Sequence, residues 1–172
     1  MKNPLSIEHK EEIGPYLDML AEMLVLVVEG ASIGFLPPIT KEAAKEYWKS
    51  IGESENSLFI AKIKDRVVGS VQVHESSSQN GAHRAEIAKM MVHPEFRQQG
   101  IARKLMIAAE EKAINDGKTL LVLDTREGTP ANNLYISLGY VEVGRIPNYA
   151  RSADGTLHTT VIYYKQIGRV TN

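Results

Sequence analysis

Cysteine is absent from the 172 residues of the chain. Its absence excludes disulfide bonds, thiolate metal sites and a cysteine nucleophile, so no cysteinyl-acyl intermediate can form. The five histidines have no spacing that favours a metal site, and we therefore expect no metal. The formal net charge is only −1, and this balance favours binding neither to nucleic acid nor to an anionic membrane surface.

Long apolar runs are missing as well. The most apolar run near the start, "MLVLVV" at residues 23–28, is much shorter than the roughly 20 residues that a membrane-spanning helix needs. Acidic residues precede it, unlike a secretory signal, so we expect a cytoplasmic protein that contacts no membrane. With 43% hydrophobic and 24% charged residues, the composition is that of a globular protein, and the length predicts a single domain over residues 1–172.

Hydrophobic spacing predicts two helices in the first third of the chain. Apolar residues recur at helical intervals from about Ile13 to Glu29, and Gly30 should end this helix. Residues 30–39 are rich in glycine and proline and are predicted to form a loop. A second helix should follow from a cap at Thr40 to about Gly52.

Three strands are expected next. Segments 57–64 and 67–75 have the apolar, β-branched composition of strands, and the short Asp65-Arg66 connection suits a hairpin. Segment 83–94 is a third strand, which its final proline should end.

The second half of the chain mixes helix and strand patterns. A helix is predicted from about residue 98 to 116, followed by "LLVL" at residues 120–123, whose continuous apolarity is typical of a strand buried on both faces. A short helix over residues 131–138 and a final hairpin with a turn at "SADG" complete the order. This order predicts an α/β fold: one mixed, mostly antiparallel sheet with one parallel, right-handed βαβ crossover and helices on both faces.

The stretch "HPEFRQQGIARKLM", residues 93–106, joins the third strand to the long helix. The first N–H groups of a helix have no partner inside it and carry partial positive charge. Gly100 and the small Ala102 would let a pyrophosphate approach these groups, and Arg97 and Arg103 would add charge-assisted hydrogen bonds. The turn is neither a Walker motif nor G-x-G-x-x-G. Its place inside a βαβ unit predicts an anion-binding site.

This stretch and "NLYISLGYVEVG" at residues 133–144 resemble the two signatures of the GNAT N-acetyltransferases, and the resemblance extends over nearly the whole chain. It implies a GNAT-like fold, acetyl-CoA as co-substrate, main-chain binding of the pyrophosphate, and main-chain contacts to the pantetheine. The candidate coenzyme-binding residues are Met91, Val92, Arg97, Gln98, Gln99, Gly100, Ile101, Ala102 and Arg103. The chain departs from the family at Gly128, where many members have an asparagine, and this puts the coenzyme contact of that asparagine in question.

Acetyl transfer to an amine requires a neutral amine, a stabilised oxyanion and a proton for the departing thiolate. Asp124 directly follows the apolar strand, and Glu86 lies on the neighbouring strand. We expect one or both of these carboxylates to orient and deprotonate the acceptor. Tyr135, in the short helix, is the candidate acid or the hydrogen-bond donor to the sulfur. The resemblance implies an oxyanion site at main-chain N–H groups near Val92.

The acceptor side is less defined. Phe35 in the loop after the first helix, Trp48 on the second helix and Tyr149 in the final hairpin are the candidate substrate-binding residues, and each is equally compatible with plain packing. Acidic groups in a cleft favour a cationic amine. We therefore expect the primary amine of a small molecule, such as an antibiotic or toxin to be detoxified, and direct transfer in a ternary complex.

Three other functions stay open from the sequence. The chain could acetylate a protein or peptide amine. It could be a non-catalytic acyl-CoA-binding module, although such a module has no use for Glu86, Asp124 and Tyr135 together. It could be a nucleotide-binding regulator, although no acidic residue has the spacing expected for ribose or Mg²⁺. The resemblance also implies pairing of two copies through the terminal hairpin, so a homodimer is the preferred assembly.

Overall fold

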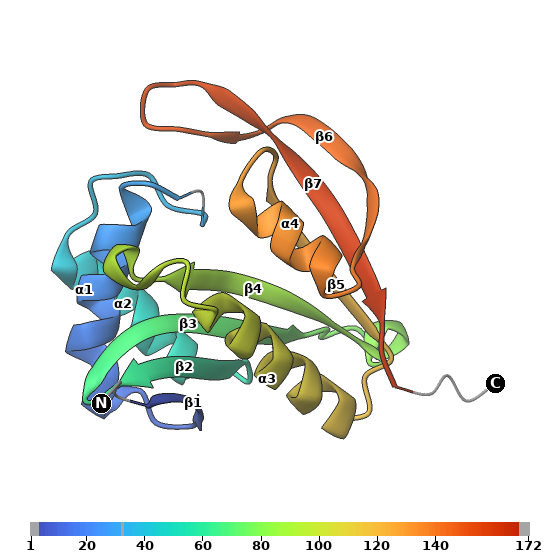
Figure 1. Cartoon of the computed structure of the whole chain (residues 1–172), viewed down its shortest axis with the longest axis horizontal. Helices are drawn as coiled ribbons and strands as arrows, with labels where there is room; N and C mark the ends of the chain where they lie inside the picture. The colour runs from blue at the N-terminus through green and yellow to red at the C-terminus, as the bar shows by residue number, and fades with distance from the viewer. Residues whose placement is uncertain (1–3, 32, 169–172) are drawn as a thin grey trace.

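The computed structural model describes residues 4–31 and 33–168 (Figure 1). The strands are β1 (Leu5–Lys10), β2 (Ser57–Ile63), β3 (Arg66–Glu75), β4 (Arg84–Val92), β5 (Leu120–Arg126), β6 (Val141–Arg151) and β7 (Leu157–Gln166). The α-helices are α1 (Leu17–Val28), α2 (Lys41–Gly52), α3 (Ile101–Asn115) and α4 (Pro130–Ser137). None of the helices in these two described ranges is long and apolar enough to cross a membrane.

The strands form one sheet in the order β1-β2-β3-β4-β5-β7-β6. β4 and β5 are parallel, α3 connects them, and the other neighbours pair antiparallel. The predicted mixed, mostly antiparallel sheet with one parallel crossover is therefore confirmed. The sequence reasoning missed β1, because "LSIEHK" alternates apolar and polar residues over too few positions to stand out.

Helices cover both faces of the sheet, as predicted (Figure 1). Leu58 and Ile60 of β2 pack in a core with α1 and α2. Phe59 and Ala61 of the same strand belong to a second core with α3 and α4. Because successive side chains of a strand point to opposite faces, each face of the sheet has a core of its own.

Two helices begin later than their hydrophobic pattern predicts. α1 begins at Leu17 rather than near Ile13, because a 3-10 turn precedes it. α3 begins at Ile101 rather than near Gln98. Gln98 and Gly100 have φ angles of 61° and 77°, which a right-handed helix does not allow. The segment before α3 is therefore a turn and not the first turn of the helix.

β5 is less buried than its apolar sequence predicts. Leu121 and Leu123 pack in the core under α3 and α4, whereas Leu120 and Val122 are half-buried. The core under α1 and α2 contains residues of β2, β3 and β4 and no described residue of β5. The second face of β5 is therefore left uncovered, and Asp124 lies on that face by strand alternation.

β4 and β5 separate partway along their length. They pair only where Arg84–Glu86 faces Leu120–Val122. Beyond Glu86, β4 has a bulge opposite Val71 of β3, and Lys89 in this bulge has a φ of 52°. A bulge bends a strand and increases its twist. The two parallel strands diverge from this point, and a gap opens between them (Figure 1).

Candidate active site

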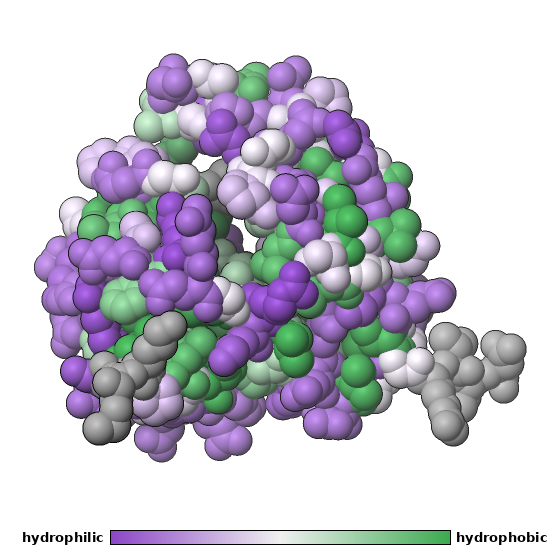
Figure 2. Space-filling model, viewed as in Figure 1, coloured by the Kyte–Doolittle hydropathy of each residue, from purple (hydrophilic) through white to green (hydrophobic). Residues whose placement is uncertain are grey.

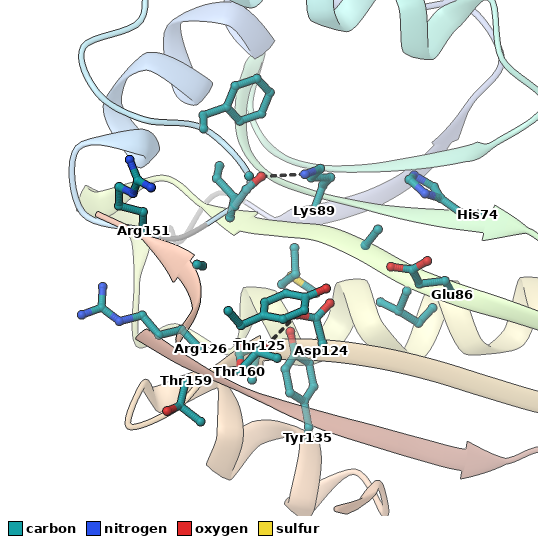
Figure 3. A pocket seen from close by; sticks show the side chains of 18 of the residues that line it. His74, Glu86, Lys89, Asp124, Thr125, Arg126, Tyr135, Arg151, Thr159 and Thr160 are labelled. Carbon is teal, nitrogen blue, oxygen red and sulfur yellow. Dashed lines mark hydrogen bonds between the residues drawn. The ribbon is translucent and has the colours of Figure 1, made fainter. Parts of the chain in front are cut away.

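A cavity of about 600 Å³ lies where β4 and β5 diverge. Its walls also include loop residues 33–36 between α1 and α2, His74 of β3, Tyr135 of α4 and the adjoining ends of β6 and β7. Figure 2 shows a hollow between the surface over the α1–α2 loop and the surface over the β6–β7 hairpin, and Figure 3 shows the side chains that line the cavity. Its volume is within the range of about 300–1,000 Å³ that is typical of small-molecule sites.

Glu86 and Asp124, the two carboxylates predicted from the sequence, both line this cavity. Glu86 is the last residue of β4 that pairs with β5. Asp124 lies just beyond the part of β5 that pairs with β4. The Thr160 hydroxyl donates a hydrogen bond of 2.7 Å to Asp124 Oδ2, which holds this carboxylate in one orientation. Among the described residues, the side chain of Glu86 has no recorded hydrogen-bond partner.

Tyr135 extends from α4 toward Asp124 (Figure 3). Its side chain is 5% exposed, and its ring lies 5.9 Å from that of Tyr140 and 6.1 Å from that of Tyr163. Burial, with smaller effects from Asp124 and Tyr163, raises the pKa of Tyr135 to about 12. No described residue accepts a hydrogen bond from its hydroxyl. Tyr135 is therefore a protonated, unpartnered donor at neutral pH.

Lys89 also lines the cavity, and the sequence reasoning did not identify it. Its Nζ donates a hydrogen bond of 2.6 Å to the Ile33 carbonyl and lies 5.5 Å from the centre of the Phe35 ring. Burial lowers the pKa of Lys89, although Asp124 and Glu86 act in the opposite direction. This side chain ties the α1–α2 loop to the bulge of β4. The bulge that directs it into the cavity leaves no simple mark in the sequence.

His74 is a second residue that the sequence reasoning missed at this site. Gln72 Nε2 donates a hydrogen bond of 2.9 Å to the Tyr47 hydroxyl, so Gln72 Oε1 is the acceptor for His74 Nε2 at 2.7 Å. His74 Nδ1 is therefore unprotonated when the ring is neutral. Burial lowers the pKa of His74, and the Glu86 carboxylate opposite it offsets this only in part. A usable signal was the pairing of β3 with β4, which aligns His74 with Glu86.

The turn before α3 presents main-chain donors to solvent. No described residue accepts a hydrogen bond from the main-chain N–H groups of residues 98–103, whereas the next one, Lys104 N–H, bonds the Gly100 carbonyl at 3.2 Å. Gly100 is exposed, and a Cβ built on it would meet no atom within 4 Å. The turn is therefore open to an anion, and these unpaired donors fit a pyrophosphate.

The other predicted coenzyme contacts are partly engaged within the protein. Arg97 Nε donates to the Val92 carbonyl at 3.4 Å, and Arg103 donates to Ser137 Oγ at 2.6 Å, which links α3 to α4. The side chains of Met91 and Ile101 are buried in the cores, so only their main-chain groups are accessible to a ligand. Beyond Glu86, the edge of β4 that faces β5 has no strand partner, as main-chain contacts to pantetheine require.

The three predicted acceptor contacts do not share one environment. Phe35 and Tyr149 line the cavity. Trp48 does not: its side chain is fully buried in the core under α1 and α2 and packs edge-on against Tyr47. The expectation that Trp48 walls the acceptor pocket is therefore wrong. Its position on the apolar face of α2 directs the indole into the core and away from the cavity.

The family asparagine that Gly128 replaces is not supplied by Asn132. The Asn132 side chain bonds the carbonyls of Arg126 and Thr129 at 2.9 and 3.0 Å and accepts a hydrogen bond of 2.8 Å from Tyr163. These bonds hold the start of α4.

In residues 4–31 and 33–168 no group of three or more potential ligands could hold a metal ion.

Comparisons with known proteins identify acetyltransferases with similar sequences. An uncharacterized N-acetyltransferase of Azospirillum brasilense, from the hisH-hisA intergenic region, is 34% identical over 104 residues, which cover 59% of this chain and 62% of that protein. N-alpha-acetyltransferase 30 of Schizosaccharomyces pombe is 32% identical over 92 residues, covering 53% of this chain and 61% of that protein. The matched region thus spans about three fifths of each relative.

Solved structures share the fold. The yncA protein of Salmonella typhimurium, in a structure with its cofactor acetyl-CoA, matches with a TM-score of 0.80 over 99% of this chain and 98% of that chain. The two sequences are 16% identical, so this match concerns the fold alone. Residues 25–140, well over half of the chain, match the acetyltransferase (GNAT) family. The chain therefore belongs to the GNAT family of acetyltransferases.

Proposed function

We propose that this protein is an acetyl-CoA-dependent N-acetyltransferase, built as one domain, that moves an acetyl group to the primary amine of a small molecule. The observation that carries the proposal is the gap between β4 and β5. At this gap, two carboxylates and an unpartnered phenol face one cavity, and the open turn before α3 lies at the far end of β4. An acyl-binding module without catalysis has no use for Glu86, Asp124 and Tyr135 at one place.

The coenzyme would be held by main chain more than by side chains. The N–H groups of residues 98–102 would bind its pyrophosphate, with Arg97 and Arg103 beside them. The unpaired edge of β4, up to Met91 and Val92, would pair with the amides of its pantetheine arm. When bound, the coenzyme supplies the acetyl thioester. Because the chain has no cysteine, transfer would be direct in a ternary complex.

The chemistry requires the acceptor amine to lose a proton before or during attack. Asp124, held by Thr160, or Glu86 would accept this proton. The amine nitrogen then forms a bond to the carbonyl carbon, the carbon–sulfur bond breaks, and the thiolate leaves. Main-chain N–H groups on the unpaired edge of β4 would stabilise the oxyanion. The Tyr135 hydroxyl would donate a hydrogen bond to the departing sulfur.

A small acceptor fits the cavity volume better than a protein does. The sequences of segments 29–35, 84–94, 123–150 and 153–165 resemble the tabtoxin resistance acetyltransferase, which supports a toxin or antibiotic as the acceptor. Acetylation of a protein amine is the second candidate, since the similar Schizosaccharomyces pombe protein is an N-alpha-acetyltransferase.

A free-thiol assay with acetyl-CoA and a panel of amines tests both candidates. The panel contains amino acids, β-lactam dipeptides, aminoglycosides, streptothricin-like compounds, polyamines and peptides with free N-termini. We expect thiol release above the hydrolysis background with a small amine and, by mass spectrometry, one added acetyl group on that amine. Release only with peptides would favour the second candidate. No release with any member would contradict catalysis.

A further inference from the structure

The cavity contains two arginines that the proposed chemistry does not use. Arg126 ends β5 and Arg151 ends β6, and both line the cavity. Among the described residues, neither guanidinium has a recorded ion pair or hydrogen bond. Figure 3 shows both side chains at one end of the cavity, on the opposite side of Asp124 from Glu86 and His74.

Arg151 differs in this respect from Arg145, the other arginine of β6. Arg145 on the same strand pairs with Glu142 at 2.8 Å and with Glu127 at 2.5 Å. The chain carries 21 acidic and 20 basic residues, so acidic partners are not scarce. A guanidinium is suited to two-pronged binding of a carboxylate or phosphate. Two unpaired guanidiniums at one cavity wall therefore form a place for an anion.

The charge of the whole cavity points the same way. The carboxylates of Glu86 and Asp124 are outnumbered by three cationic side chains, Lys89, Arg126 and Arg151. The His74 ring, whose pKa burial lowers, adds no positive charge at neutral pH. A polycationic amine would meet repulsion at the arginine end. A molecule with an ammonium group at one end and an anion at the other would match both ends.

We propose that Arg126 and Arg151 form an anion subsite, and that the acceptor is an amino-acid-like molecule whose carboxylate, or an equivalent phosphorus oxyanion, binds there while its amine lies at Asp124 and Glu86. This assignment rests on the proposed acetyltransferase function and adds the substrate class to it. It differs from the expectation of a simple cationic amine, which took only the acidic residues into account.

The test compares each amino acid that the protein acetylates with the corresponding amino acid amide. The amide keeps the free amine and lacks the negatively charged carboxylate. For the wild-type protein, we expect kcat/KM to be at least tenfold higher for the acid than for the amide, because a hydrogen-bonded ion contact of this kind is worth roughly a factor of ten or more. Phosphonate analogues in the same assay separate a preference for phosphorus oxyanions from one for carboxylates.

Variants locate the subsite. Arg126→Gln and Arg151→Gln should each raise the KM for the acid roughly tenfold, with little change in the KM for the amide or for acetyl-CoA. Arg145→Gln is the matched control, because Arg145 lies on β6 outside the cavity, and it should change none of these constants. Circular dichroism checks that each variant is folded.

Three results would overturn the assignment and are distinguishable. Equal use of acids and amides by the wild-type protein would exclude an anion subsite while leaving the acetyltransferase function intact. A raised KM for acetyl-CoA in the arginine variants would assign these side chains to the coenzyme. If no amine caused thiol release, the proposed function would be excluded, and the substrate class with it.

Discussion

Replacing Glu86 by Gln and Asp124 by Asn together is expected to lower kcat/KM for the acceptor about a hundredfold or more, the usual contribution of a positioned general base. Both changes keep the shape of the side chain and remove the ability to accept a full proton. The effect should be smaller at high pH, where more of the acceptor amine is already neutral. Steady-state thiol release across pH measures this.

The single variants assign the role. We expect Asp124→Asn to account for most of the loss, because the hydrogen bond from Thr160 orients the Asp124 carboxylate and its charge acts on both Tyr135 and Lys89. Glu86→Gln should have a smaller effect, since no described residue fixes its carboxylate. Glu111→Gln, an exposed change on α3, is the matched control and should leave the activity unchanged. A double variant with activity close to that of the wild-type protein would remove both carboxylates from the mechanism.

Changing Tyr135 to Phe is expected to lower kcat at least tenfold while the Kd for acetyl-CoA changes little. Since burial raises the pKa of Tyr135 to about 12, its proton is not readily given up to a thiolate. The parent thiol has a pKa of about 8.5, and the gap of about 3.5 units corresponds to roughly 5 kcal/mol against complete transfer. A hydrogen bond to the developing negative charge on sulfur is therefore the role that we expect.

The pH dependence of kcat separates this role from acid catalysis at an ordinary pKa. A raised pKa keeps the phenol protonated to higher pH, so kcat of the wild-type protein should show no loss from Tyr135 near pH 10, about where a free tyrosine ionises. Tyr140→Phe is the control: its hydroxyl is buried beside Glu110, and its ring packs against Tyr135. Turnover of Tyr135→Phe equal to that of this control would contradict the role.

The fold could be predicted from the sequence where local sequence patterns agree with the tertiary structure. Thr40 caps α2 as predicted, with its Oγ1 accepting a hydrogen bond of 3.1 Å from Ala43 N. The two predicted hairpins and the parallel crossover are present as well. These features depend on short-range patterns, such as a capping residue or a turn between two apolar runs, and such patterns are visible in a single sequence.

The cavity could be predicted from the sequence only in part, because its walls come from segments far apart in the chain. Asp124 could be placed because it lies near the carboxyl end of a predicted parallel strand, and Glu86 because it lies on the strand beside it. Lys89 could not, since a β-bulge directs its side chain to the cavity. His74 was missed, although the pairing of β3 with β4 aligns it with Glu86. Trp48 was assigned to the cavity for its residue type, although the face of α2 on which it lies points into the core.

A crystal structure of the protein with acetyl-CoA tests the central claim most directly. We expect pyrophosphate oxygens within hydrogen-bond distance of the main-chain N–H groups of residues 98–102, and the acetyl group between β4 and β5 beside Asp124 and Tyr135. A coenzyme bound at another surface, or a turn before α3 filled by the protein's own side chains, would contradict it.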